Sequence, residues 1–365
     1  MKNASDFQRS DNIVILGIET TCDETACAVV ENSRKVISSV VSSQVELHAP
    51  YGGVVPEIAS RAHLEMINPV ISQTINRART VLQSRQDNTS EFRIDAIAVA
   101  NTPGLIGSLL VGLMAAKTLA WVWRVPLIGV NHLHAHAYAP ALDAEPINYP
   151  AVALIASGGH TSLYFCQSCL DVELLGATID DAAGEAFDKV SAILGLGYPG
   201  GPAIERAAKT GRADRIKFPR ALLDEDSLDF SFSGIKTAVL YYVNGTPGAI
   251  RSGVTKGIEK LTEQDKADIA ACFQAAMVDM MVIKLRRAAI AYKAKTLIIG
   301  GGVSANSALR EAVCKLGEDI GAKVRLPALQ YACDNAAMVA GLGYHYLQAG
   351  KIDDLRLDAI PTTRQ

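Results

Sequence analysis

The sequence predicts an α/β protein built from two lobes. Its 365 residues are more than one compact hydrophobic core ordinarily holds. A strand–turn–strand pattern occurs in each half of the chain, and segments with helical spacing of apolar residues lie between these patterns. With 49% apolar and 20% charged residues, the composition is that of a globular enzyme.

The first strand–turn–strand unit is NIVILGIETTCDETACAVVEN. Residues 13–18 form a β-branched apolar run, the segment ETTCDET is a turn of small and acidic residues, and residues 26–30 resume an apolar strand. Residues 57–78 then carry apolar side chains at helical spacing. The apolar run 104–123 is interrupted by Lys117, which leaves less than the roughly 18 residues that span a bilayer. We therefore expect a buried, glycine-rich helix there and no membrane span.

Three of the seven histidines lie in NHLHAHAYAP, residues 131–140. In a helix, His132 and His136 share one face at the spacing that lets two imidazoles chelate one metal ion, while His134 points elsewhere. The alternative is a partly buried, hydrogen-bonded pair of rings. The protease motif His-Glu-x-x-His has its glutamate where Leu133 stands, so metalloprotease chemistry would lack its base.

A third metal ligand must come from a distant segment, and Asp334 in ACDNAAMVA is the candidate. This aspartate lies at a predicted helix start, ahead of an apolar helix. A plain N-cap residue would have the same position and composition. The local sequence leaves both interpretations open.

The second strand–turn–strand unit is YPAVALIASGGHTSLYFCQ, in which strands 151–156 and 163–166 flank the turn SGGHTS. A Gly/Pro turn then leads into a helix that begins near Pro202. A long helix is predicted over residues 263–293, with Thr262 and Asp265 as a variant capping box. A third glycine turn, GGGVSAN, follows a buried strand at 296–299 and precedes a helix with Asn306 or Ser307 near its cap.

Glycine turns at strand ends allow backbone N–H groups to approach a phosphate, although each turn alone is more simply a tight turn. Several such turns in one α/β chain favour a nucleotide ligand. The sequence contains no G-x-x-x-x-G-K-[ST] motif and no Rossmann G-x-G-x-x-G between a strand and a helix. A two-lobed protein with phosphate-binding hairpins in both lobes is the simplest remaining picture.

Charge and cysteines restrict the function further. The formal net charge is −3, so a nucleic acid would need a local basic face or a partner protein. The seven cysteines are odd in number and scattered, and the polar N-terminal segment lacks a secretory h-region, so we expect reduced thiols and a cytoplasmic protein. Cys166 and Cys169 form a C-x-x-C without a second pair at zinc-ribbon spacing.

An ordered set of motifs resembles the TsaD family, whose members are tRNA N(6)-adenosine threonylcarbamoyltransferases. The motifs are GIETTCDET, NHLHAH, ASGGHTS, AFDKV, GYPGGPAIE, FSFSGIKTA, GGGVSAN and CDNAAM, between about residues 13 and 346. The resemblance implies the actin-like, sugar-kinase-like (ASKHA) fold. It also implies transfer of threonylcarbamoyl from threonylcarbamoyl-AMP to the exocyclic amine of adenosine 37, with release of AMP, in tRNAs that read codons starting with A.

The resemblance also assigns site residues. One divalent metal ion per subunit, with iron favoured and zinc as the alternative, is expected on His132, His136 and Asp334. The family often has a glutamate where His134 stands, so we expect His134 to be a surface residue. His160 is the better functional histidine outside the metal site, and no general base is assigned. The expected substrate contacts are Ile155, Ala156, Ser157, Gly158, Gly159, Asp188, Gly201, Glu205 and Asn306.

The expected lobes are residues 1–142 and 143–335, with a C-terminal helix and tail, 336–365, that packs back on the first lobe. Asp334 would then come from across the cleft. The expected partners are tRNA, an inactive TsaB-type paralogue and a small TsaE-type ATPase, with no membrane. Two other functions stay open from the sequence: a metallopeptidase, which Leu133 argues against, and a non-catalytic nucleotide-binding scaffold.

Overall fold

The computed structural model describes residues 12–84, 92–224, 226–245 and 257–362. These residues fold into two compact units. The first unit comprises Met1–Ile147 and Pro327–Gln365, and the second comprises Asn148–Leu326. The sequence places the divisions at 142/143 and 335/336, whereas the structure places them at 147/148 and 326/327. The difference matters for Asp334, which belongs to the first unit together with His132 and His136 and does not come from the other lobe.

Each unit contains a five-stranded mixed sheet, and the two sheets have the same strand order. The first sheet is ordered β3-β2-β1-β4-β5 and the second β8-β7-β6-β9-β10. In both, the first three strands are antiparallel neighbours and the last two run parallel to the first. The repeated strand–turn–strand pattern in the sequence is therefore the start of one topology that occurs twice.

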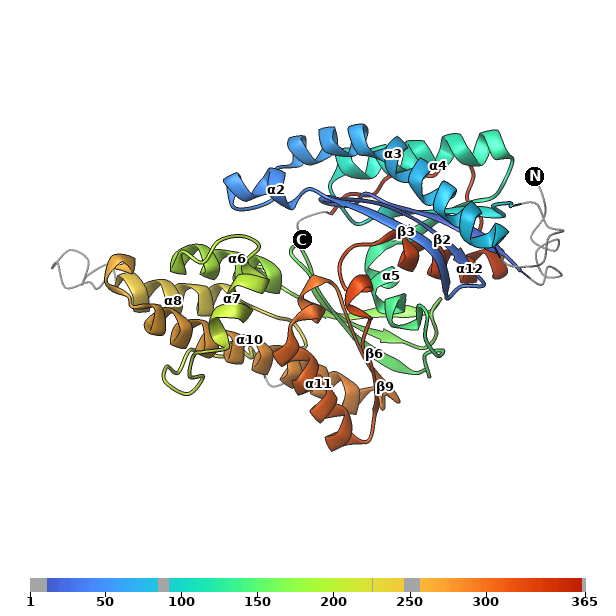
Figure 1. Ribbon diagram of the computed structural model, residues 1–365. Helices are drawn as coiled ribbons and strands as arrows, with labels where there is room; N and C mark the ends of the chain where they lie inside the picture. The colour runs from blue at the N-terminus through green and yellow to red at the C-terminus, as the bar shows by residue number, and fades with distance from the viewer. Residues whose placement is uncertain (1–11, 85–91, 225, 246–256, 363–365) are drawn as a thin grey trace. The chain divides into compact units, whose positions relative to one another are not determined.

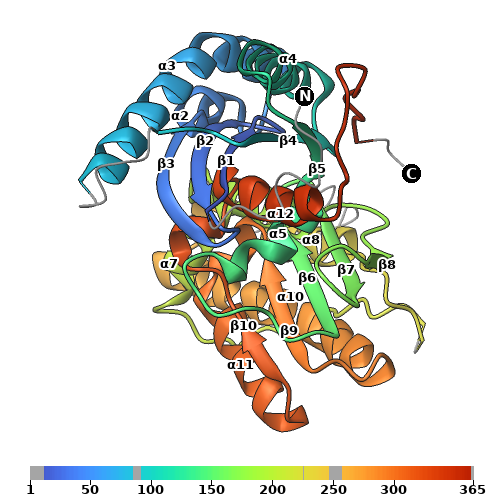
Figure 2. The same ribbon diagram turned by 90° about the vertical axis from the view of Figure 1, so that its right-hand side faces the viewer.

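The first unit has these elements, visible in Figures 1 and 2: β1 (Val14–Glu19), β2 (Glu24–Glu31), β3 (Lys35–Ser43), α2 (Val45–His48), α3 (Pro56–Gln83), β4 (Ala96–Thr102), α4 (Ile106–Trp123), β5 (Leu127–Asn131), α5 (His132–Tyr138) and α12 (Ala336–Gln348). Short 3₁₀ turns cover Ala49–Tyr51, Ala139–Ala141 and Leu329–Tyr331.

The second unit has these elements: β6 (Ala151–Ala156), β7 (Thr161–Cys166), β8 (Val172–Ala177), α6 (Ala183–Leu194), α7 (Gly200–Ala208), α8 (Ser233–Asn244), α10 (Glu263–Ala291), β9 (Thr296–Gly300), α11 (Ser307–Ile320) and β10 (Lys323–Arg325). Short 3₁₀ turns cover Ile258–Lys260 and Gly302–Ala305.

Alternation along β1 determines how helices cover the first sheet. Val14, Leu16 and Ile18 point into the apolar core that the sheet forms with α3 and α4. The opposite face of β1 presents Gly17, and α12 packs there (Figure 2). A Cβ added to Gly17 would lie 2.2 Å from the Ala336 carbonyl oxygen, so the missing side chain lets the start of α12 contact the strand directly. This contact fixes the segment that carries Asp334.

The expected long helices are present, and the capping box at Thr262 and Asp265 is confirmed by reciprocal hydrogen bonds of 3.1 Å. The expectation of a buried, glycine-rich helix at 104–123 holds for one face of the helix only. Among the described residues, α4 alone is long and apolar enough to cross a membrane, and 39% of that segment is buried. Leu109 and Leu113 lie in the core between α3 and the sheet. The outer face is exposed, with Trp121 68% accessible.

Candidate metal centre

The two histidines are positioned by a strand that leads directly into a short helix. β5 ends at Asn131 and α5 begins at His132. The Asn131 side chain caps α5, because its Oδ1 accepts hydrogen bonds from the backbone N–H groups of Leu133 (2.9 Å) and His134 (3.1 Å). The helix puts His132 and His136 on one face, and their ring centroids are 4.6 Å apart.

Asp334 reaches these rings from the segment before α12. The N-cap of that helix is Asn335, whose Oδ1 accepts a hydrogen bond from the backbone N–H of Met338 at 3.0 Å. Asn335 also donates to the carbonyl oxygens of Tyr331 (3.2 Å) and Cys333 (2.9 Å). The capping role that the sequence could not separate from metal binding therefore belongs to Asn335, and the Asp334 carboxylate is directed toward the histidines.

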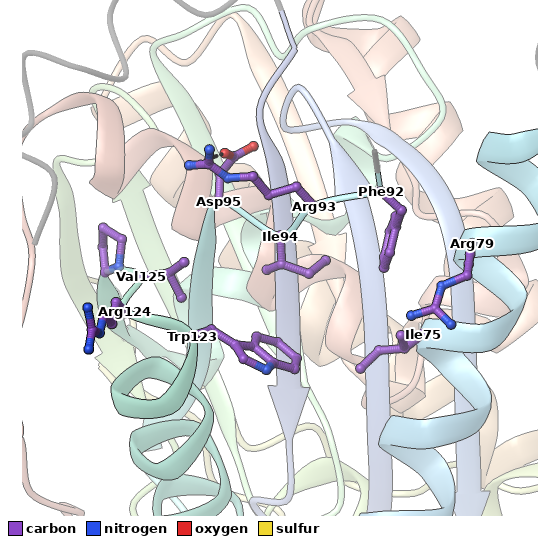
Figure 3. Close-up of a pocket in the computed structure, with 10 residues that line it drawn as sticks. Ile75, Arg79, Phe92, Arg93, Ile94, Asp95, Trp123, Arg124 and Val125 are labelled. Carbon is purple, nitrogen blue, oxygen red and sulfur yellow. Dashed lines mark ion pairs between the residues drawn. The ribbon is translucent and has the colours of Figure 1, made fainter. Parts of the chain in front are cut away.

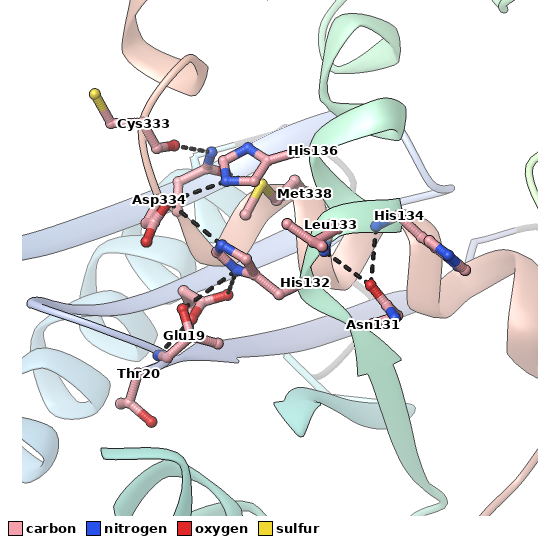
Figure 4. Close-up of polar contacts among 12 residues, drawn as sticks. Glu19, Thr20, Asn131, His132, Leu133, His134, His136, Cys333, Asp334 and Met338 are labelled. Atoms are coloured by element: carbon pink, nitrogen blue, oxygen red, sulfur yellow. Dashed lines mark hydrogen bonds and ion pairs between the residues drawn. The ribbon is translucent and has the colours of Figure 1, made fainter. Parts of the chain in front are cut away.

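The three side chains converge on one point, as Figure 4 shows. The Nε2 atoms of His136 and His132 lie 3.0 and 3.5 Å from Oδ1 of Asp334. All three potential ligand atoms lie within 4.8 Å of one another. Two ligands of a tetrahedral zinc ion, each about 2.0–2.1 Å from the metal, would be roughly 3.3 Å apart. The two His–Asp distances are close to that separation, so these three residues are a set that could hold a divalent metal ion. His134 points away from the group (Figure 4).

Glu19, which no motif in the sequence marks as a site residue, lies behind His132 and is fully buried. Its Oε2 is 2.8 Å from Nδ1 of His132, and its Oε1 accepts a hydrogen bond from the backbone N–H of Thr21 at 2.7 Å. A carboxylate on the second ring nitrogen is the usual way to orient a metal-binding histidine. Nδ1 of His136 is buried without a hydrogen-bond partner among the described residues. The sequence does contain one indication of Glu19, because this acid directly follows five apolar residues of a predicted strand.

Negative charge is concentrated around this group. Burial alone would lower the pKa of His132, but Glu19 and Asp334 outweigh it and raise that pKa to about 9. Burial lowers the pKa of His136. The pKa of Glu24 is raised well above its ordinary value by burial and then by the nearby charges of Asp23 and Asp334. A bound cation would relieve this repulsion, so the electrostatics agree with the donor geometry.

The residues expected to contact substrate all lie in the second unit. Ser157, Gly158 and Gly159 form the turn between β6 and β7, and both glycines are exposed. Gly201 lies in the first turn of α7. Ile155 and Ala156 are the buried end of β6. The Ser157 backbone N–H closes the turn by donating to the His160 carbonyl oxygen at 2.7 Å, so only the two exposed glycines present backbone that a ligand could reach.

The polar residues expected to contact substrate already have protein partners. Asp188 accepts a hydrogen bond from the Gly200 backbone N–H at 2.6 Å, and Glu205 accepts one from the backbone N–H of Ser307 at 3.0 Å. The Asn306 side chain caps α11 and donates to Gln274 at 2.8 Å. The contact of Asp188 connects α6 with α7, and that of Glu205 connects α7 with α11. Both residues therefore have a structural role, in addition to any role in substrate binding.

The duplicated sheet topology is typical of the actin-like, sugar-kinase-like (ASKHA) class, and solved structures of this class resemble this chain. One is a full-length HypF in its phosphate- and nucleotide-bound form (TM-score 0.56, 15% identity, 93% of this chain and 55% of that chain). Another is component A of (R)-2-hydroxyglutaryl-CoA dehydratase from Acidaminococcus fermentans (TM-score 0.50, 14% identity, 92% and 99%). Fold and donor set thus define an ASKHA-type protein whose first unit contains a group able to hold a metal ion.

Sequence comparisons give the family. The model of the TsaD family, "tRNA N6-adenosine threonylcarbamoyltransferase", matches residues 35–341. Curated proteins of that name match nearly the whole chain, at 49% identity in Symbiobacterium thermophilum (95% of this chain, 96% of the relative) and 48% in Carboxydothermus hydrogenoformans (96% and 97%). The chain belongs to the TsaD family and is therefore a tRNA threonylcarbamoyltransferase.

Proposed function

We propose that this protein transfers the threonylcarbamoyl group of threonylcarbamoyl-AMP to the exocyclic amine of adenosine 37, with release of AMP. The tRNAs are those that read codons starting with A. The main support for this proposal is the convergence of His132, His136 and Asp334. A metal ion on these residues would give a transferase of this family a place to hold the phosphate and carbamoyl oxygens of the donor. We assign the three residues as ligands of one divalent metal ion, iron first and zinc second.

A metal bound there would supply Lewis-acid stabilisation of negative charge on the donor. Glu19 would keep His132 in the orientation that leaves its Nε2 free for coordination. In the second unit, the exposed backbone N–H groups of Gly158 and Gly159 are suited to donate to phosphate oxygens. Asp188 and Glu205 are carboxylates, which are suited to accept hydrogen bonds from ribose hydroxyls. Positioning and electrostatic stabilisation would then supply most of the rate acceleration.

The proposed partners are tRNA, a TsaB-type paralogue and a TsaE-type ATPase, and the proposed location is the cytoplasm. A metallopeptidase is disfavoured, because Leu133 is 6% exposed and apolar at the position where such an enzyme needs a glutamate. A pure scaffold is disfavoured by membership in a transferase family. Peptide cleavage that requires the metal and is lost in His132→Ala would revive the peptidase function.

The test combines metal analysis with a modification assay. We expect the purified chain to contain about one iron or zinc per subunit and His132→Ala and Asp334→Ala to lose it. With partners, threonylcarbamoyl-AMP and unmodified tRNA, the native chain should form threonylcarbamoyladenosine, detected by mass spectrometry of digested nucleosides. His134→Ala is the matched control, since His134 points away from the group. Unimpaired modification by both metal-site variants would contradict the proposed ligands.

A further inference from the structure

A pocket lies in the first unit at the amino ends of β4 and β5, and no residue expected to bind metal or substrate lines it. Its volume is about 530 Å³, within the range of ligand-binding pockets. Figure 3 shows the side chains around it, which come from the end of α3, the approach to β4 and the α4–β5 connection. The lining residues are Ile75, Arg79, Phe92, Arg93, Ile94, Asp95, Trp123, Arg124, Val125 and Pro126.

The charged residues of this pocket are mainly cationic. The lining includes three arginines and one acid, Asp95. Oδ1 of Asp95 lies 3.3 Å from Arg93, and its Oδ2 accepts a hydrogen bond from the Val14 backbone N–H at 3.1 Å. Arg79 and Arg124 form no ion pair with any residue in the described part of the chain, and both are exposed. The pocket therefore carries an excess of two positive charges in a chain with a net charge of −3.

Aromatic rings accompany these charges. The Arg79 guanidinium lies over the Phe92 ring, 5.9 Å from its centroid, within the range of a cation–π contact. The Trp123 ring is another flat apolar surface, and in Figure 3 it extends toward the pocket while the neighbouring Arg124 side chain extends the other way. Arginine binds phosphate through its planar fork, and aromatic rings accept stacked bases. Arginines next to aromatic rings are more typical of sites that bind RNA than of sites that bind an acidic peptide. An acidic peptide has carboxylates for the arginines but few flat rings to stack on the aromatic side chains.

We propose that this pocket binds the phosphate backbone and an adjacent base of the substrate tRNA, outside the nucleotide that is modified. The inference rests on the proposed function. β5 connects the two sites: Pro126 precedes this strand and His132 follows it, so roughly 20 Å of extended chain separates them. One tRNA can extend over that distance. The pocket gives a protein of negative net charge the local cationic surface that a polyanion requires.

The first experiment measures tRNA affinity as a function of salt, using the full chain with its partners. In Arg79→Gln/Arg124→Gln, we expect binding to weaken about tenfold or more at 0.1 M salt. The plot of log K against log salt has a negative slope, and the slope should become shallower by about 0.7–0.9 for each lost phosphate contact. Arg77→Gln is the matched control, because Arg77 is an exposed arginine on the same helix that does not line the pocket. Unchanged affinity and slope in the double variant would overturn the inference.

The second experiment uses fluorescence from Trp123. The chain has two tryptophans, Trp121 and Trp123, so Trp121→Phe leaves Trp123 as the single reporter. We expect unmodified tRNA to change its emission and excess AMP or poly-glutamate to leave it unchanged. A response to AMP or poly-glutamate but not to tRNA would overturn the inference in favour of a nucleotide or a protein ligand.

The outcomes separate this inference from the proposed function. If the native chain with its partners modifies no tRNA, the proposed function fails whatever the arginine variants do. If the native chain modifies tRNA and the double variant binds and modifies it equally well, only the inference about the pocket fails. Metal content and thermal unfolding should match the native chain in all the arginine variants, which excludes a folding defect as the cause of weaker binding.

Discussion

At the scale of single residues, Glu19 is the side chain whose role the structure defines most closely. It is fully buried, and its two oxygens contact Nδ1 of His132 and the backbone N–H of Thr21. Thr21 contributes a further contact, with its Oγ1 at 3.3 Å from the same ring nitrogen. Burying a carboxylate is costly without such partners, so its position here indicates a function in orienting the histidine.

We expect Glu19→Gln to weaken metal binding by about 10- to 100-fold, because the neutral amide no longer supports the electron density of the His132 ring. The affinity for Zn²⁺ should be measured at pH 9 with a competing chelator, where protons compete least for the ring. Glu46→Gln serves as a control on an exposed acid in the same unit. Equal affinities for native protein and Glu19→Gln would show that Glu19 has only a structural role.

The pKa of His132 predicts a pH dependence of metal binding. Because this pKa is raised to about 9, a proton occupies the ring at neutral pH and must leave when the metal binds. Apparent affinity should therefore rise by up to about tenfold per pH unit until the pH approaches 9, whereas an ordinary histidine would level off near pH 6.5. Titrations at pH 6.5, 7.5 and 8.5 measure this rise. A flat profile over that range would contradict the pKa.

At the scale of elements, the close contact between β1 and α12 controls where Asp334 lies. Gly17 contacts the first turn of α12, and Gly343 of the same helix lies against β4, where an added Cβ would be 2.6 Å from Cβ of Ala98. Small residues on both surfaces let the helix lie directly on the sheet. The apolar pattern of the sequence predicts that α12 is buried, but the closeness of its approach depends on which small residues face each other.

We expect Gly17→Ala to lower the free energy of unfolding by about 1–3 kcal/mol, because the new methyl group would overlap the Ala336 carbonyl and push α12 away. The displacement also moves Asp334, so metal affinity should fall in the same variant. Gly53→Ala is the matched control, since nothing lies within 4 Å of its added Cβ. Denaturant unfolding and metal titration measure the two effects, and native values of both would refute this account of the packing.

At the scale of the whole molecule, the candidate metal group and both tryptophans lie in the first unit. Each unit has its own apolar core, so the two can unfold as separate transitions. Tryptophan emission then reports the unfolding of the first unit, while circular dichroism reports both. Because the candidate metal group lies in the same unit as both tryptophans, tryptophan emission during unfolding can report metal binding without an activity assay.

Metal loading should stabilise the first unit selectively. At free metal 100-fold above the dissociation constant, we expect about 2.7 kcal/mol of stabilisation and a rise of roughly 5–10 °C in the midpoint followed by tryptophan emission. Asp334→Ala should abolish the rise, and His134→Ala should retain it. A rise of the same size in Asp334→Ala would place the bound metal elsewhere in the chain.

The sequence by itself determined the local elements and the chemical identity of the candidate ligands. Apolar runs bounded by small polar turns located β1, β2 and β6, because these strands are buried on both faces. Helical spacing of apolar residues located the long helices, because one face of each is buried. The spacing of His132 and His136 fixed their common face, because four residues make about one helical turn. The ordered motifs predicted the TsaD family and the ASKHA fold, which the comparisons confirmed.

Only the tertiary structure decided which distant groups meet. The sequence could not separate capping from metal binding at Asp334, and it assigned this residue to the wrong unit. Contacts between segments about 200 residues apart depend on how α12 packs on the first sheet, which no local pattern records. The same holds for Glu19 behind His132 and for the pocket at the amino ends of β4 and β5. Both are formed by residues from separate segments, which only the pairing of the strands brings together.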